Sequence, residues 1–290
     1  MADRKLIALV VMMVAVILAG SFFFVLALLR ESGETFFLGS AVGLVEIEGL
    51  VLSGERVISE LEHYRRAESV GAIVIRIDSR GAGVVAAQEI YEQIQRISVE
   101  GKPVVVSMGS VAASGGYYIA CAADKIVANP GTITGSIGVI MEFPNAQELF
   151  KKVGLKFETI KSGKYKDTGT PAREMTPDER GMLGEVVQDS WEQFVRMISN
   201  ERNLPIEEVI EVADGRIISG TTAKELGLID ELGTLKDAIV LAGELAGIEG
   251  EPKVLKKKRA SRLFDLLSDL VSKISRSEIP FSLEYRMTIP

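Results

Sequence analysis

Strand-like apolar runs alternate with helical patterns through the middle of the chain, and this alternation constrains the fold more than any other feature. The run Ala72–Ile77 is apolar except for Arg76, as expected of a strand covered on both faces. Val84–Ile97 follows it with apolar residues at helical spacing, and Pro103–Met108 is a second buried run. Such alternation predicts an α/β protein with a mainly parallel sheet.

The same patterns place the remaining elements. Thr176 is a good helix N-cap, because Glu179 follows at the position that completes a capping box. Further strands are expected at 41–51, 125–128, 136–141 and 157–160, and further helices at 56–66, 114–123, 145–153, 177–200, 205–213, 221–226 and 235–247. Residues 41–250 are therefore expected to form the folded body.

The stretch Leu6–Leu29 contains no charged residue. A helix over it could cross the roughly 30 Å hydrocarbon core of a bilayer, and it is too long for the apolar part of a cleaved secretory signal. We expect an uncleaved transmembrane anchor in residues 1–29 and a juxtamembrane linker at 30–40. Because Arg4 and Lys5 precede the span, the positive-inside rule predicts a single-pass protein of the cell membrane with a cytoplasmic N-terminus and an extracytoplasmic body.

The composition excludes several kinds of site. The net charge of −7 disfavours a general nucleic-acid binder, because phosphate contacts need a basic surface. The single cysteine, Cys121, excludes an intramolecular disulfide and makes a cysteine-rich metal site implausible. The single histidine, His63, lies in a predicted helix among charged residues, where a solvated side chain is expected. The sequence predicts neither a metal ion nor an organic cofactor.

Residues 251–290 differ from the body. Apolar residues from Leu263 to Ile274 recur at helical spacing, which predicts an amphipathic helix, and the basic run Lys256–Arg259 precedes it. This helix could pack on a neighbouring protomer, lie on anionic lipid, or dock near an active-site groove. The residues alone leave these three alternatives open.

The stretch Ser107–Ala120 (SMGSVAASGGYYIA) contains a candidate nucleophile. A buried strand ends near Met108, and a helix of small residues begins around Ser114. A serine at this junction lies close to the free backbone N–H groups of a helix start, which suit a developing oxyanion. Gly115 and Gly116 remove side chains that would block a substrate carbonyl. Tight helix–strand packing would select the same small residues, so this stretch by itself leaves both interpretations open.

The turn Asp78–Gly83 follows the strand Ala72–Ile77 and could donate a second N–H group. It lies where sites form in parallel sheets, at the carboxyl end of a strand. A phosphate-binding loop is disfavoured, because the turn has neither the G-x-x-x-x-G-K-[ST] nor the G-x-G-x-x-G pattern.

A nucleophilic serine needs a base, and His63 is not expected to supply it. Three lysines, Lys161, Lys164 and Lys166, lie between a predicted strand and the helix capped by Thr176. One of them would have to be desolvated so that its pKa falls toward neutrality. The chemistry of the residues does not choose among the three.

Two segments, MGSVAASGGYYIACAADKIVANPGTITGSIGVIME and FETIKSGKYKDTGTPAREMTPDE, resemble the signal peptide peptidase A (SppA) family of Ser-Lys peptidases. The resemblance runs from about Val42 to Ile248. It implies that Ser114 is the nucleophile, that Lys166 is the general base and that Ser136 holds the lysine in place. It also implies an oxyanion hole formed by the N–H groups of Gly115 and Gly81. The family turn usually reads N-S-P-G-G, whereas this chain has Asp78-Ser79-Arg80-Gly81-Ala82.

The resemblance further implies a Clp/crotonase-like α/β fold and the hydrolysis of remnant signal peptides through an acyl-enzyme. Family members of this length form rings in which neighbouring protomers supply the serine and the lysine. A homo-oligomer that binds apolar peptides is therefore expected.

Three other functions are weighed against this one. A related membrane Ser-Lys peptidase would use the same dyad on the apolar segments of one specific membrane protein. A crotonase-like acyl-thioester enzyme would share the oxyanion hole but needs neither a nucleophilic serine nor an anchor. An inactive membrane-anchored scaffold is the non-enzymatic alternative, and labelling of Ser114 by a fluorophosphonate would exclude it.

Overall fold

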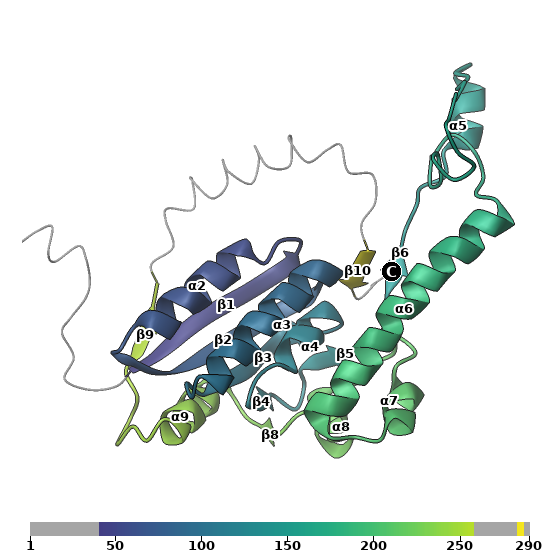
Figure 1. Ribbon diagram of the computed structural model, residues 1–290. Coiled ribbons are helices and arrows are strands. Elements are labelled where there is room, and N and C mark those ends of the chain that lie inside the picture. The colour runs from purple at the N-terminus through teal and green to yellow at the C-terminus, as the bar shows by residue number, and fades with distance from the viewer. Residues whose placement is uncertain (1–40, 258–282, 287–290) are drawn as a thin grey trace, which may run out of the picture. The chain divides into compact units, whose positions relative to one another are not determined.

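A computed structural model describes residues 41–257 and 283–286 of the chain (Figure 1). Its central strands lie in the order β9-β1-β2-β3-β4-β8, and every neighbouring pair among them is parallel. Their bounds are Ala41–Val51 (β1), Val70–Gly83 (β2), Val104–Ala112 (β3), Lys125–Ala128 (β4), Glu231–Leu232 (β8) and Val254–Lys256 (β9). The predicted α/β class with a mainly parallel sheet is confirmed.

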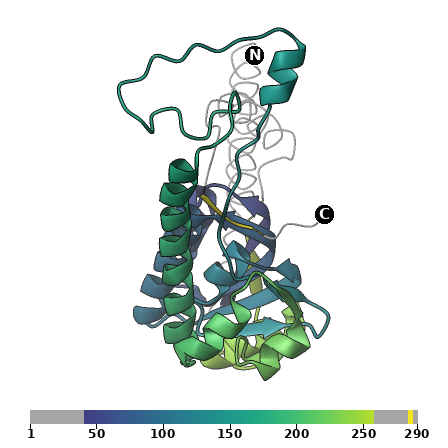
Figure 2. The same ribbon diagram turned by 90° about the vertical axis from the view of Figure 1, so that its right-hand side faces the viewer.

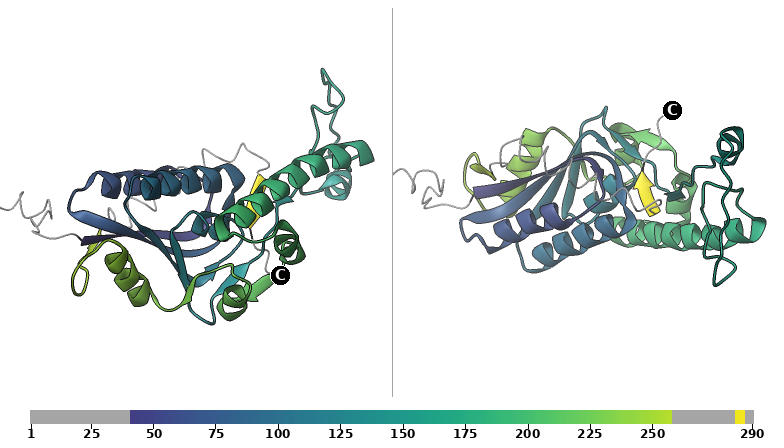
Figure 3. Two further views of the ribbon diagram at one scale, coloured as in Figure 1. Left: turned by 60° about the horizontal axis from the view of Figure 1, so that its bottom comes forward. Right: turned by 90° about the horizontal axis from the view of Figure 1, so that it is seen from above.

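Helices cover both faces of this sheet, as Figures 1 and 3 show. The helices α2 (Glu55–Arg66) and α3 (Val84–Val99) lie on one face, and α9 (Leu235–Leu245) lies on the other. Alternate residues of β2 point to the two faces, so that Ile75 packs with α2 and α3 while Val74 packs with α9. Both side chains are fully buried, which explains why the sequence of β2 is continuously apolar from Ala72 to Ile75.

The remaining elements continue from the carboxyl ends of the strands. Their bounds are Gly115–Ala120 (α4), Ile133–Gly135 (β5), Ile140–Met141 (β6), Gln147–Lys152 (α5), Pro177–Arg202 (α6), Ile206–Val212 (α7), Ile217–Ser219 (β7), Gly220–Glu225 (α8) and Leu283–Arg286 (β10). Here β5 pairs parallel with β3 and antiparallel with β7, whereas β10 runs antiparallel between β2 and β6. These short pairings enclose the end of the sheet where β3 meets α4.

Residues 142–176 form an arm between β6 and α6. Figures 1 and 2 show this arm, with α5 in it, projecting beyond the sheet at the N-terminal end of α6. The predicted cap is confirmed: the Thr176 side chain accepts from the Glu179 N–H, and the Glu179 carboxylate accepts from the Thr176 N–H. The arm therefore returns to the body at a well-defined helix start.

Two expectations for local structure are wrong. The segment 157–160 is not a strand, because it lies in the arm, and it makes no sheet pairing there. The Gly-rich segment 78–83 is not a separate turn but the continuation of β2, because it pairs with β1 and β10. The expected strand 136–141 is confirmed only at Ile140–Met141.

Several predictions concern residues outside the described part of the chain. These are the transmembrane helix at 1–29, the linker at 30–40 and most of the basic amphipathic segment after residue 257. Within residues 41–257, no helix has both the length and the apolar character that a bilayer span requires.

Candidate active site

Ser114 lies at the junction of β3 and α4 with a backbone that few residues other than glycine adopt. Its φ is 54° and its ψ is −117°, and its side chain is fully buried. A non-glycine residue in such a conformation costs on the order of 1–3 kcal/mol and persists only where the surroundings enforce it. A sharp strand-to-helix turn that presents a serine hydroxyl is the geometry of a nucleophile elbow.

The turn after β5 holds Ser114 in this conformation. The Ser114 N–H donates to the Gly135 carbonyl at 2.8 Å, and the Ser114 hydroxyl lies 3.5 Å from the Gly138 carbonyl oxygen. The preceding residue is fixed from the other side, because the Ala113 N–H donates to the Ser79 carbonyl at 3.1 Å. The strained serine is therefore clamped between β2 and the 135–138 turn.

The Gly115 N–H is available as an oxyanion donor. Gly115 is buried at the first position of α4, and within the described residues its N–H has no hydrogen-bond acceptor, whereas the Gly116 N–H donates to the Ala113 carbonyl at 2.9 Å. A buried donor without a partner is costly, so a free N–H beside a buried serine is typical of a site that binds a carbonyl oxygen.

Gly81 lies at the other side of the site but its N–H is engaged. It donates to the Ser79 hydroxyl at 3.2 Å, and this hydroxyl lies 2.5 Å from the Gly49 carbonyl oxygen. Gly81 has a φ of 154°, a conformation that L side chains rarely adopt. To serve as a second oxyanion donor, the Gly81 N–H would have to leave Ser79.

Ser136 also belongs to this cluster. It follows Gly135, whose carbonyl accepts from Ser114, and it is 6% exposed with a left-handed φ of 49°. Its N–H donates to the Arg216 carbonyl at 2.8 Å. The structure thus brings together Ser114, Gly115 and Ser136 around one turn, with Gly81 on the neighbouring strand.

Lys166 does not join this cluster within one chain. It lies in the arm between α5 and α6, its side chain is exposed, and its ammonium has no hydrogen bond or ion pair among the described residues. The other candidate lysines are engaged, Lys161 with Asp167 and Lys164 with Asp178. Of the three lysines, Lys166 alone has an ammonium without such a partner in the described part of the chain.

The arm exposes an unusual amount of apolar surface. Its exposed apolar side chains are Leu149, Val153, Leu155, Phe157, Ile160 and Tyr165. Exposed apolar surface concentrated in one segment is typical of an interaction site. The arm that carries Lys166 therefore has the surface expected of a segment that contacts a partner.

Helix α4, which follows Ser114, and its C-cap residue Cys121 are buried. Burial raises the pKa of the Cys121 thiol to about 12 and raises the pKa of the Tyr117 hydroxyl well above its usual range. The Tyr117 hydroxyl donates to the Leu228 carbonyl at 2.8 Å. Both groups therefore stay protonated, although the charges of Arg202 and Asp230 also act on their pKa values.

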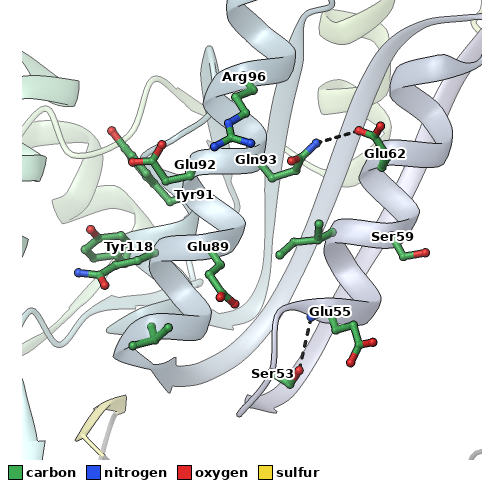
Figure 4. Close-up of a pocket in the computed structure, with 13 residues that line it drawn as sticks. Ser53, Glu55, Ser59, Glu62, Glu89, Tyr91, Glu92, Gln93, Arg96 and Tyr118 are labelled. Atoms are coloured by element: carbon green, nitrogen blue, oxygen red, sulfur yellow. Dashed lines mark hydrogen bonds between the residues drawn. The ribbon is translucent and has the colours of Figure 1, made fainter.

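A separate hollow of about 1080 Å³ lies between α2 and α3 (Figure 4). Glutamates are the commonest of its labelled side chains, and Ser114 is not among its lining residues. Glu62 in this hollow accepts from Gln93 at 3.2 Å and pairs with Arg65. Within the part of the chain whose side chains are described, no group of three or more His, Cys, Asp or Glu residues is arranged as a metal site.

Sequence reasoning missed two features of the site. Ala82 approaches Gly115 so closely that it fixes the distance between β2 and α4, and Ser79 holds the Gly81 N–H. The glycines around both residues drew attention to the loops, but neither alanine nor serine carries a local signal of such a role.

Comparisons with known proteins show the family. The sequence profile of Peptidase family S49 matches residues 96–249. "Putative protease slr0021" of Synechocystis sp. is 45% identical over 72% of this chain and 75% of its own length. "Serine protease SPPA, chloroplastic" of Arabidopsis thaliana is 35% identical over 88% of this chain and 37% of its own length. "Putative signal peptide peptidase SppA" of Enterococcus faecium is 34% identical over 64% of this chain and 54% of its own length. The chain belongs to peptidase family S49 and is a serine peptidase.

Proposed function

We propose that this serine peptidase is membrane-bound and hydrolyses remnant signal peptides through a dyad of Ser114 and Lys166. The observation that carries the proposal is the strained, buried Ser114 beside the Gly115 N–H, which has no acceptor in the described part of the chain. The name of the Enterococcus faecium relative, "Putative signal peptide peptidase SppA", supports signal peptides as the substrate class. The uncharged stretch Leu6–Leu29 supports the anchor, and the charges before it support an extracytoplasmic body.

In the proposed reaction, neutral Lys166 takes the proton of the Ser114 hydroxyl as its oxygen attacks the peptide carbonyl carbon. The N–H groups of Gly115 and Gly81 stabilise the oxyanion, with Gly81 released from Ser79 when substrate binds. The C–N bond breaks as the Lys166 ammonium protonates the leaving amine. Water then hydrolyses the acyl-enzyme with Lys166 again as the base, which regenerates Ser114.

The position of Lys166 supports a dyad shared between protomers. Within one chain Lys166 is exposed on the arm, whereas Ser114 and Ser136 lie at the end of the sheet. The apolar side chains of the arm would be covered if the arm packed on a second copy of the chain. In that assembly the Ser136 hydroxyl would accept a hydrogen bond from the incoming lysine, or donate one to it, and so hold the lysine in place.

The edges beside the site support the binding of an extended peptide. The strand β10 pairs antiparallel with Gly81–Gly83 on one side and with Ile140–Met141 on the other. The space between Gly81–Gly83 and Ile140–Met141, which β10 occupies, therefore accepts an extended backbone. Main-chain hydrogen bonds of this kind bind peptides with little dependence on sequence. Apolar signal-peptide fragments would bind there in the same extended form.

The test uses two variants that are each expected to be inactive, Ser114→Ala and Lys166→Ala. Mixed and reassembled in equal amounts, they should regain about a quarter of the wild-type sites, because random pairing unites an intact serine with an intact lysine that often. Lys156→Ala is the matched control and should remain active, because Lys156 is an exposed lysine of the arm that makes no hydrogen bond or ion pair among the described residues. Activity of either single variant on an apolar peptide would contradict the dyad, and mixtures that stay inactive would contradict its sharing between protomers.

Labelling with a fluorophosphonate separates the remaining alternatives. We expect labelling of the wild-type protein and none of Ser114→Ala, since the probe reacts with an activated serine. An inactive scaffold would not label. Cleavage of one membrane protein with no cleavage of several signal peptides would favour the related peptidase with a specific partner.

A further inference from the structure

A cluster of charged side chains lies at the base of the arm, outside the Ser114 site. The Arg173 guanidinium donates to both Asp167 oxygens, at 3.2 Å from Nε and 2.9 Å from Nη2. It also donates to Glu179 at 2.8 Å from Nη1. A guanidinium that engages two carboxylates at once is held in one orientation, because each pairing fixes the plane of the fork.

Glu179 anchors this cluster to the body. Its side chain is only 2% exposed in the first turn of α6. One of its oxygens accepts from the Thr176 N–H at 2.8 Å, and the other accepts from the Thr168 hydroxyl at 3.1 Å. The hydrogen bonds from Arg173, followed by those from Thr176 and Thr168, hold the pKa of Glu179 well below its usual range, so the carboxylate stays charged.

Asp167 carries the connection to the lysine, because it is the residue next to Lys166 in the chain. Hydrogen bonds from Arg173, and secondarily from the Lys161 ammonium at 2.5 Å, lower the pKa of Asp167 to about 2. The carboxylate is therefore fully charged and both of its oxygens are occupied by cations other than Lys166.

We propose that Arg173 is a positioning residue for Lys166, since it ties the turn 161–167 to the start of α6 and keeps the Asp167 carboxylate engaged away from the lysine. This inference rests on the proposed role of Lys166 as the general base. Arg173 need not touch the substrate, because it acts through the turn that carries the lysine.

The charge balance around the turn explains why the arginine matters chemically. Asp167 and Glu179 are neutralised by Arg173 and Lys161, and Lys164 is paired with Asp178 on α6. A carboxylate that is free beside an amine favours the charged ammonium, which cannot take a proton from the serine. Loss of Arg173 would thus both loosen the turn and offer the Asp167 carboxylate to Lys166.

The experiment measures kcat, KM and the pH dependence of kcat/KM on an apolar peptide with the full-length protein. Arg173→Met removes both the positive charge and the planar guanidinium that binds two carboxylates, whereas Arg173→Lys retains only the charge. The double variant Arg173→Met/Asp167→Asn removes the liberated carboxylate as well. Arg196→Met is the matched control, because Arg196 is an exposed arginine on α6 that pairs only with Glu192 among the described residues.

For Arg173→Met we expect kcat to fall about 10-fold or more with little change in KM, because the base is misplaced but the peptide site is intact. The acidic limb of the pH profile should move up by about one unit. The double variant should restore the limb but not kcat, and Arg173→Lys should keep the limb near its wild-type position. The Arg196→Met variant should match the wild type in both.

The proposal would be overturned if Arg173→Met folds and assembles but its acidic limb in the pH profile of kcat/KM stays at the wild-type position. A kcat within about 2-fold of the wild type would also overturn it. If Arg173→Met fails to fold, Arg173→Lys decides: its kcat must fall while its limb stays in place. Lys166→Ala separates this inference from the proposed dyad. An active Lys166→Ala variant refutes the dyad itself, whereas an inactive one with wild-type behaviour of the Arg173 variants refutes only the role of Arg173.

Discussion

A Cβ atom added to Gly115 would stand 2.4 Å from the backbone nitrogen of Ala82, a distance that real Cβ contacts do not reach. The neighbour is backbone in the paired part of β2, so it cannot move aside as a flexible side chain would. The contact sets how closely α4, with Ser114 before it, approaches β2.

Gly115→Ala should therefore displace the free N–H from its place beside Ser114. We expect kcat/KM to fall by about 100-fold or more, the usual effect of losing one oxyanion donor. Gly131→Ala is the matched control, because a Cβ there would meet nothing within 4 Å, and it should retain activity. Wild-type kinetics for Gly115→Ala would show that its N–H does not stabilise the transition state.

Removal of β10 should improve peptide binding. Deletion of residues 283–290 exposes the edge of β2 at Gly81–Gly83. With β10 present, an extended substrate would have to displace β10 before it could pair with this edge. The KM for an apolar peptide should fall several-fold while kcat stays within about 2-fold. Deletion of residues 287–290 alone leaves β10 in place and should change neither. An increase in KM would mean that β10 supports the peptide site instead of competing for it.

Glu62 should contribute to stability above acidic pH. Hydrogen bonds from Arg65, and then from Arg66, outweigh burial and lower the pKa of Glu62 from 4.5 to about 2. Because the folded pKa is the lower one, the stabilisation is complete above about 4.5 and is lost as the pH falls toward 2. Glu62→Gln should therefore lower the urea midpoint at pH 7 and lessen its decline between these two pH values.

The control for Glu62 is Glu89→Gln on the neighbouring helix. Glu89 is exposed and makes no hydrogen bond or ion pair among the described residues. Its replacement should leave the dependence of the urea midpoint on pH as in the wild type. Equal slopes in Glu62→Gln and the wild type would contradict the assigned role of the Arg65 pairing.

The core at β2 should be sensitive to the loss of volume. Ile75 is fully buried between the sheet and the α2–α3 layer, so Ile75→Ala should reduce the free energy of unfolding by about 3 kcal/mol. Val99→Ala removes a branched side chain that is 83% exposed and should change the same quantity by less than about 0.5 kcal/mol. Urea unfolding followed by circular dichroism measures both, and a similar cost for the two variants would contradict the assigned packing.

The parallel sheet could be predicted because its signal is local. Each buried strand, such as Ala72–Ile77, reads as an apolar run whichever strand lies beside it. The segment 78–83 could not be assigned in the same way, because its glycines favour a turn and only its pairing with β1 and β10, far away in the sequence, keeps it extended. At 157–160 the residues favour a strand, but the arm offers no neighbour with which to pair.

The residues of the candidate site also differ in how much local signal the sequence carries for them. Small residues at a strand–helix junction made Ser114 and Gly115 candidates, and the structure adds the strained backbone of the serine, which the sequence could not predict. Ser136 came only from the family motif, since a turn after a short strand carries no chemical signal of its own. Lys166 could not be separated from Lys161 and Lys164 by composition, because what distinguishes them is the ion pairs that the other two make.

The pairing of β9 with β1 has a consequence for how the protein is made. The ribosome releases β1 to β4 in the order in which they neighbour one another, so this part of the sheet can form as it emerges. The outer strand beside β1 is supplied by residues 254–256, which leave the ribosome after all the other strands of this parallel order. Until then, β1 presents an unpaired edge, which is the kind of surface that aggregates in nascent chains. A chaperone that shields this edge during synthesis would therefore have to leave it before the last strand can take its place.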